Sequence, residues 1–182
     1  MTLLTREFYS QNTEHVAKAL LGCTLVHRIN NLEYSGRIVE TEAYLGSHDL
    51  ASHPSKGITK RSATMFGPPG HAYIYLIYGM YHCFNIVTEP EGIGTAVLIR
   101  ALEPIANITL NTKGPGLLCK AMQITKAQNG LDLVSNNLFV QNDGYEVEHI
   151  VAKPRIGVAY AKDWAQRPLR FYIRDNPFVS KP

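Results

Sequence analysis

Residues 71–87, HAYIYLIYGMYHCFNIV, constrain the fold more than any other segment of the chain. Two runs of β-branched and aromatic residues, which favour strands, flank a single glycine. Glycine takes positive φ without strain, and a two-residue type II′ hairpin turn needs glycine at its first position. The pattern therefore predicts strands at 73–78 and 81–87, joined by a tight turn at Gly79-Met80.

The same segment gathers four tyrosines within nine positions, namely Tyr73, Tyr75, Tyr78 and Tyr81. Side chains alternate along a strand, so Tyr73 and Tyr75 are expected on one face and Tyr78 on the other. One interpretation is a core strand pair with ordinary cross-strand aromatic packing. That interpretation explains Tyr75 well, but it gives no reason for aromatic rings at the wet tip of a hairpin.

The rest of the chain predicts one α+β domain over 1–182, with a mostly antiparallel, curved β-sheet, a few flanking helices and the protruding tyrosine-rich hairpin. The elements expected are a helix at 12–22, strands at 23–29 and 32–45, a long loop at 46–72, a buried strand at 95–104, a helix at 113–125, and short strands from residue 133 with one helical turn near 161–165. Long loops in compact domains are often functional.

Composition narrows the class of protein. Hydrophobic residues make up 45% of the chain, enough for a packed core, and the net charge of +3 permits a polyanionic partner without requiring one. The three cysteines, Cys23, Cys83 and Cys119, are odd in number and widely spaced, which favours reduced thiols. No signal peptide or membrane-spanning run is present, so an intracellular protein without a membrane partner is expected.

The stretch GRIVETEAYLG places two carboxylates on one face of the expected strand, because Glu40, Glu42 and Tyr44 alternate with other residues. Carboxylates are depleted in strand interiors. One interpretation is an edge strand with a solvated face. The other is a general base near the strand's end, with Glu42 closer to the long loop than Glu40. Arg100 closes the apolar run AVLIR, either as a surface residue or as the partner of a buried carboxylate.

No metal site is expected. His48 and His53 share a loop with Asp49, but the chain has no HExxH motif and no cysteine pair at zinc spacing. There is no nucleophile elbow and no phosphate-binding P-loop, and the segment PEGIGT is interpreted as a turn.

Five blocks occur in one order along the chain: RIVETEAYLG, YIYLIYGMYHCFN, LIRALEP, TKGPG and RPLRFYIR. Together they resemble the alkyladenine (3-methyladenine, methylpurine) DNA glycosylase family, from about Leu4 to Ser180. The resemblance implies an enzyme that flips a damaged purine out of duplex DNA and hydrolyses its N-glycosidic bond. The chain departs from the family pattern after GPG, where it has Leu117 and Leu118 and the family often has a lysine.

The resemblance also implies residue roles. Glu42 matches the catalytic glutamate that activates water, and Arg100 matches the arginine that helps to hold that water and the glutamate. Tyr44, His53 and Tyr75 match the aromatic walls of the base pocket. Water is then the nucleophile, and neither a cofactor nor a metal is implied. No matched catalytic position is lysine, so the resemblance implies a monofunctional glycosylase without Schiff-base chemistry.

Further matched positions concern the DNA. Tyr78 matches the residue that fills the gap left by the flipped base, and Asn85 matches the side chain that obstructs the exocyclic amine of guanine. Val158 matches a pocket position whose backbone carbonyl faces the water and the base. Weaker DNA contacts are expected from Met80, Tyr81 and Lys113. The implied partner is double-stranded DNA containing an alkylated or deaminated purine, bound by a monomer.

Two other functions remain open from the sequence. One is a non-catalytic binder of distorted DNA, against which Glu42 and Arg100 argue, because such a protein gains nothing from a carboxylate beside the DNA backbone. The other is a carbohydrate-active hydrolase that uses Glu40 and Glu42, which alternation along one strand places about 6.5–7 Å apart. The single tryptophan and the basic charge balance count against it.

Overall fold

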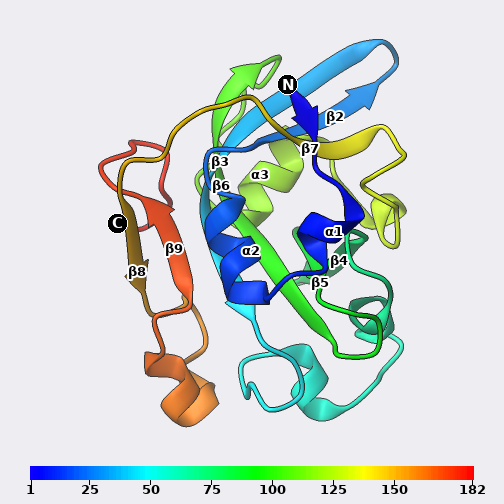
Figure 1. Cartoon of the computed structure of the whole chain (residues 1–182), viewed down its shortest axis with the longest axis vertical. Helices are drawn as coiled ribbons and strands as arrows, with labels where there is room; N and C mark the ends of the chain where they lie inside the picture. Colours follow the sequence, from blue (N-terminus) through cyan, green and yellow to red (C-terminus); the bar gives the residue numbers. More distant parts are fainter.

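Nine antiparallel strands form one sheet in the structure, a computed structural model that describes residues 1–182 (Figure 1). The strands are β1 (Thr2–Leu3), β2 (Thr24–Ile29), β3 (Leu32–Tyr44), β4 (Ala72–Ile77), β5 (Tyr81–Thr88), β6 (Thr95–Ala106), β7 (Leu138–Asn142), β8 (Ile150–Lys153) and β9 (Arg170–Ile173). The main path through the sheet runs β1-β7-β2-β3-β6-β5-β4, and β9 joins it at β3 while also pairing with β8. The predicted α+β class with a mostly antiparallel sheet is therefore confirmed.

Short helices flank this sheet. They are α1 (Arg6–Tyr9), α2 (Thr13–Ala19) and α3 (Pro115–Ala121), with the 3₁₀ helices η1 (His53–Lys56), η2 (Ala63–Phe66), η3 (Lys126–Gln128) and η4 (Ala159–Gln166). The helix predicted at 12–22 is α2, and Asn12 caps it by accepting bonds from the amides of Glu14 and His15. The helix predicted at 113–125 is α3, which begins at Pro115 after Gly114.

Strand β3 lies inside the sheet over most of its length. Its first half pairs with β2, its second half pairs with β9, and β6 pairs along its other edge. Glu40 and Glu42 stand opposite Tyr172 and Arg170 of β9, and both carboxylates are fully buried. The interpretation of this segment as an edge strand with a solvated face is therefore wrong, because β9 returns from the far end of the sequence to cover it.

The core lies where the helices cover the sheet. Helix α2 packs on β3, β6 and β9, and in Figure 1 it crosses the middle strands, with β8 and β9 to the left. Helix α3 packs on β5 and β6. Three register shifts interrupt the pairing of β3 with β6, and such bulges bend and twist the strands. None of the helices is both long and apolar enough to cross a membrane.

The turn between β4 and β5 differs from the prediction by one residue. Tyr78 and Gly79 both have positive φ, of 53° and 68°, and the amide of Met80 donates to the carbonyl of Ile77 at 3.2 Å. The predicted turn at Gly79-Met80 is therefore wrong. Gly79 still supplies positive φ, but as the second of two such residues, and Ile77 pairs with Tyr81, so three residues, Tyr78–Met80, connect the strands. Strand β4 consequently ends before Tyr78, so side-chain alternation does not decide where its ring points.

Candidate active site

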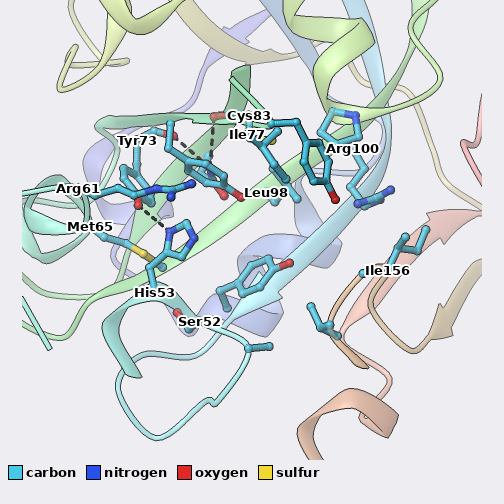
Figure 2. Close-up of a pocket in the computed structure, with 18 of the residues that line it drawn as sticks. Ser52, His53, Arg61, Met65, Tyr73, Ile77, Cys83, Leu98, Arg100 and Ile156 are labelled. Carbon is cyan, nitrogen blue, oxygen red and sulfur yellow. Dashed lines mark hydrogen bonds between the residues drawn. The ribbon is translucent and has the colours of Figure 1, made fainter. Parts of the chain in front are cut away.

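A pocket of about 380 Å³ opens between the tyrosine-rich strands, the long loop and the segment before η4. Concave sites of this size are typical of small-molecule and base binding. Figure 2 shows His53, Tyr73, Arg61 and Met65 on one side of the pocket, and Arg100 and Ile156 on the other. Strands β3, β4, β5 and β6 each contribute to the lining, so residues far apart in the sequence meet here.

The rings of His53, Tyr73 and Tyr75 form an aromatic wall of the pocket. The centroids of His53 and Tyr75 are 4.6 Å apart, with the rings nearly perpendicular, and Tyr73 lies 5.4 Å from Tyr75. The hydroxyl of Tyr73 is hydrogen-bonded to Nδ1 of His53 at 2.7 Å. Tyr75 and Tyr44 also line the pocket. The structure therefore brings together the three residues that the resemblance assigned to the base pocket walls.

Burial sets the protonation state of this wall. It lowers the pKa of His53 to about 4, with smaller contributions from the positive charges of Arg61 and Lys56. The imidazole is therefore neutral at pH 7. Burial also raises the pKa of Tyr73 to about 12, so its hydroxyl keeps its proton. The hydrogen bond between them joins two neutral groups.

Glu42 lies directly behind the lining, since it is fully buried and its partners Tyr44, Arg100 and Ile156 form the pocket surface. Its Oε1 accepts a hydrogen bond of 2.8 Å from the backbone amide of Ile156 and lies 3.4 Å from Nη1 of Arg100. Its Oε2 accepts a bond of 2.7 Å from the hydroxyl of Tyr44. The carboxylate is therefore held in one orientation by donors from three separate parts of the chain.

Arg100 also contacts a second buried carboxylate. Its Nε donates to Oε1 of Glu40 at 3.3 Å, and Nη1 of Arg170 donates to the same oxygen at 3.0 Å. The backbone amide of Ser180 donates to Oε2 of Glu40 at 2.7 Å. Arg100 is therefore a buried partner of both glutamates and not a surface residue. No role was predicted for Arg170 or Ser180, because only the tertiary fold brings β9 and the C-terminal segment to β3.

A buried ion pair that was not predicted from the sequence lies next to the pocket residue Tyr44. Arg155 donates to both carboxylate oxygens of Asp49, at 2.6 and 2.8 Å, and both side chains are completely buried. Asp49 also accepts from the amides of Leu45 and Ala51. The guanidinium of Arg155 lies 4.8 Å from the centroid of the Tyr44 ring. Asp49, which stands between two histidines in the sequence, is therefore engaged by an arginine.

Asn85 and Val158 line the pocket as well. The side-chain amide of Asn85 donates to the backbone carbonyls of Tyr73 at 3.1 Å and Cys83 at 3.4 Å, which fixes its orientation between β4 and β5. The carbonyl of Val158 accepts a bond of 2.9 Å from the amide of Ala161. Both residues are buried.

The hairpin tip has a different character. Tyr78 is 85% exposed and borders the same pocket as Tyr75, and it lies beyond the end of β4. The left-handed turn redirects the Tyr78 ring after the strand has ended. Met80 and Tyr81 are exposed and lie outside the lining. Tyr81 packs so closely on Gly116 that an added Cβ there would lie 2.7 Å from the ring.

Cationic groups stand at the mouth of the pocket and beyond it. Arg61, an exposed loop residue that the sequence analysis did not single out, donates to the carbonyl of Leu76 at 3.1 Å. Its guanidinium lies 5.0 Å from the centroid of the Tyr75 ring. Lys113 is exposed just before α3 and is not part of the lining.

Comparison with known proteins gives a consistent result. The family model of methylpurine-DNA glycosylase matches residues 7–177. A relative from Legionella pneumophila (strain Paris) is 60% identical over 182 residues, covering all of both chains. One from Anaeromyxobacter dehalogenans (strain 2CP-1) is 51% identical, covering 98% of this chain and 86% of the relative. One from Methanocella arvoryzae is 50% identical, covering 100% and 97%. All three carry the provisional name 3-methyladenine DNA glycosylase.

Proposed function

The chain belongs to the methylpurine-DNA glycosylase family, whose members are hydrolases of DNA repair, and we propose that it excises damaged purines as a monofunctional glycosylase. The substrate is an alkylated or deaminated purine that is flipped out of double-stranded DNA. Candidate bases are 3-methyladenine, 7-methylguanine, ethenoadenine and hypoxanthine. The protein acts as a monomer with water as the nucleophile and no cofactor, and it leaves an abasic site.

One observation carries this proposal: a buried carboxylate, oriented by three donors, lies directly behind an aromatic pocket. The pocket volume of about 380 Å³ is sufficient for a single base. Tyr44, Tyr75 and His53 present ring faces and edges on which a purine can stack. A cationic purine gains roughly 0.5–2 kcal/mol from the face of each electron-rich ring. Recognition of an extruded base by stacking is typical of enzymes that flip bases.

In the reaction, Glu42 removes a proton from a water molecule that binds to both its carboxylate and Arg100. The water oxygen bonds to C1′ of the sugar while the bond from C1′ to the base nitrogen breaks, and the electron pair leaves with the base. The negative carboxylate also stabilises the positive charge that develops on the sugar, as one carboxylate does in inverting glycosidases. A purine alkylated at N3 or N7 departs as a neutral molecule.

A neutral purine would leave as an anion, so its departure requires a proton or another group that stabilises the negative charge. His53 is not the source of a proton at neutral pH, because burial lowers its pKa to about 4. No lysine lines the pocket, which supports direct hydrolysis by water over a Schiff-base intermediate.

Tyr78 takes the place of the extruded base. Unstacking a base costs a few kcal/mol, and an aromatic side chain inserted into the gap recovers part of the lost stacking. Tyr78 is the most exposed aromatic ring at the rim of the pocket. Asn85 disfavours guanine-type bases relative to adenine-type bases, because it obstructs their exocyclic amine. The carbohydrate-active alternative needs a second carboxylate at the pocket. All three partners of Glu42 line the pocket, whereas Arg170 and Ser180, two of the three partners of Glu40, lie outside the lining.

The test uses duplex oligonucleotides that each contain one hypoxanthine or ethenoadenine, together with alkylated DNA for the methylated bases. Abasic sites are cleaved with alkali after incubation. Glu42→Gln keeps the shape of the side chain and removes the base, so lesion-DNA binding stays near wild type and excision falls by roughly 10²–10⁴-fold. Glu148→Gln, at an exposed loop position, is the matched control and keeps full activity.

Wild-type protein that binds these DNAs without creating alkali-sensitive sites would favour the non-catalytic binder instead. Excision by Glu42→Gln within a few-fold of wild type would remove Glu42 from the role of general base.

A further inference from the structure

Arg100 lies between two buried carboxylates and is shared by both. Its Nε is 3.3 Å from Oε1 of Glu40, and its Nη1 is 3.4 Å from Oε1 of Glu42. Neither carboxylate side chain has exposed surface, and that of Arg100 is only 9% exposed. Both contacts are longer than the usual 2.7–2.9 Å of an ionic hydrogen bond. The guanidinium is thus divided between the two acids.

Glu40 has two further partners besides Arg100. Nη1 of Arg170 lies 3.0 Å from its Oε1, and the amide of Ser180 donates to its Oε2 at 2.7 Å. Arg170 in turn donates to the carbonyls of Pro154, at 3.1 Å, and Lys181, at 2.6 Å. Strand β9 and the C-terminal segment therefore anchor Glu40, so it cannot follow Arg100 if Arg100 moves toward Glu42.

We propose that Glu40 is a positioning residue, which holds Arg100 in this divided position and so limits how strongly Arg100 pairs with Glu42. The inference rests on the proposed role of Glu42 as the general base. A carboxylate in a tight, undivided pair with arginine is stabilised as the anion and accepts a proton from water less readily. A carboxylate with no arginine loses the group that orients it. Glu40 therefore keeps Arg100 in contact with Glu42 but prevents a tight ion pair between them.

Several other groups face Glu42 from the surrounding elements, but none of them contacts both Glu40 and Glu42. Tyr44 lies on β3 itself, Tyr75 on β4 and Cys83 on β5, while Arg155 and Tyr160 approach from the C-terminal part of the chain. Glu40 faces Arg100 from β6 and Arg170 from β9. Arg100 is the one cation that directly contacts both acids, so a change at Glu40 reaches Glu42 through it.

The experiment measures single-turnover excision between pH 5 and pH 9 on the lesion DNA that wild type cleaves fastest. In Glu40→Gln, Arg100 shifts toward Glu42, so the acidic limb of the pH–rate profile moves to lower pH by roughly one unit. The rate at the plateau falls by about tenfold, because the base is weaker. Binding to lesion DNA changes by less than about threefold, since Glu40 does not line the pocket. Glu40→Asp retains the charge and restores the wild-type profile.

Ser180→Pro gives a second, independent readout, because it removes the amide that donates to Oε2 and leaves the charge of Glu40 intact. Glu40 then holds Arg100 more strongly, and the acidic limb moves to higher pH, opposite to Glu40→Gln. Glu103→Gln, a partly buried glutamate of β6 bonded to Asn176, is the matched control and leaves the profile unchanged.

Opposite shifts in Glu40→Gln and Ser180→Pro support the inference. An acidic limb that stays in place in both folded variants overturns it, even if their melting temperatures fall, because a purely structural role changes stability alone. Should Glu40→Gln not fold, the direction of the Ser180→Pro shift decides alone. A failure of this inference is distinguishable from a failure of the proposed function. If the proposed function is wrong, Glu42→Gln itself retains excision.

Discussion

The hydroxyl of Tyr44 donates a hydrogen bond of 2.7 Å to Oε2 of Glu42, two residues earlier on the same face of β3. Burial, reinforced by the negative charge of Glu42, raises the pKa of Tyr44 well above its usual value. The hydroxyl therefore keeps its proton at neutral pH and remains a donor. One residue thus supplies both a ring to the pocket and a donor to the carboxylate behind it.

Tyr44→Phe separates these two contributions. Glu42 loses a donor that stabilises its negative charge, so the acidic limb of the excision profile moves to higher pH. The ring remains, so binding to lesion DNA changes by less than about threefold. Excision rates and binding, measured on one oligonucleotide across pH, check both points. A Phe variant with an unmoved acidic limb would show that the hydrogen bond does not influence the carboxylate during catalysis.

Tyr78→Ala tests the exposed ring at the turn. Because Tyr78 is 85% exposed, its removal hardly alters the melting temperature, whereas loss of a buried aromatic ring costs roughly 3–5 kcal/mol. Affinity for lesion DNA falls by about 1–3 kcal/mol, the usual value of one base–aromatic stack. Alanine needs the same positive φ as tyrosine here, so the comparison isolates the ring.

Tyr78→Phe is the matched control, because the ring and not the hydroxyl fills the gap in the DNA. It is nearly neutral in both binding and melting. A large drop in melting temperature for Tyr78→Ala, with undiminished affinity in the folded protein, would return this tyrosine to a packing role.

Asn85→Ser tests how the pocket discriminates among bases. The side-chain amide of Asn85 is fixed by the carbonyls of Tyr73 and Cys83, so it cannot swing aside for a guanine amine. The shorter serine opens this space, and release of 7-methylguanine rises relative to 3-methyladenine. Both bases are measured in one digest of methylated DNA, with the exposed Asn137→Ser as control. An unchanged ratio would exclude Asn85 as the selective residue.

His53 makes stability depend on pH in a direction set by its burial. Its pKa is about 4 in the folded protein against a usual value of 6.5, so the unfolded chain binds more protons between these values. The contribution of His53 to stability is therefore complete above pH 6.5 and decreases as the pH falls toward 4. Urea unfolding at pH 7 and pH 4.5 shows a smaller decrease in His53→Gln than in wild type. Equal decreases in the two proteins would contradict this assignment.

Local patterns were sufficient for most secondary structure. The cap at Asn12, the Gly-Pro-Gly entry to α3 and the alternating apolar runs of β2–β6 all depend on residues adjacent in the sequence. Alternation also placed Glu40 and Glu42 on one face, and both do contact the same arginine. The connection between β4 and β5 begins at Tyr78, one residue earlier than predicted, because tyrosine also favours strands and the pattern does not mark where strand pairing ends.

The sequence by itself determined the antiparallel α+β class, the elements of the sheet and the family, since these follow from propensity, side-chain periodicity and ordered motifs. Tertiary structure alone decided that β3 is buried between β6 and β9, that Arg170 and Ser180 hold Glu40, and that Arg155 pairs with Asp49. Except for the pairing of β3 with β6, these contacts join residues more than a hundred positions apart. Which buried charges pair depends on how the strands are ordered in the sheet, and local sequence patterns do not determine that order.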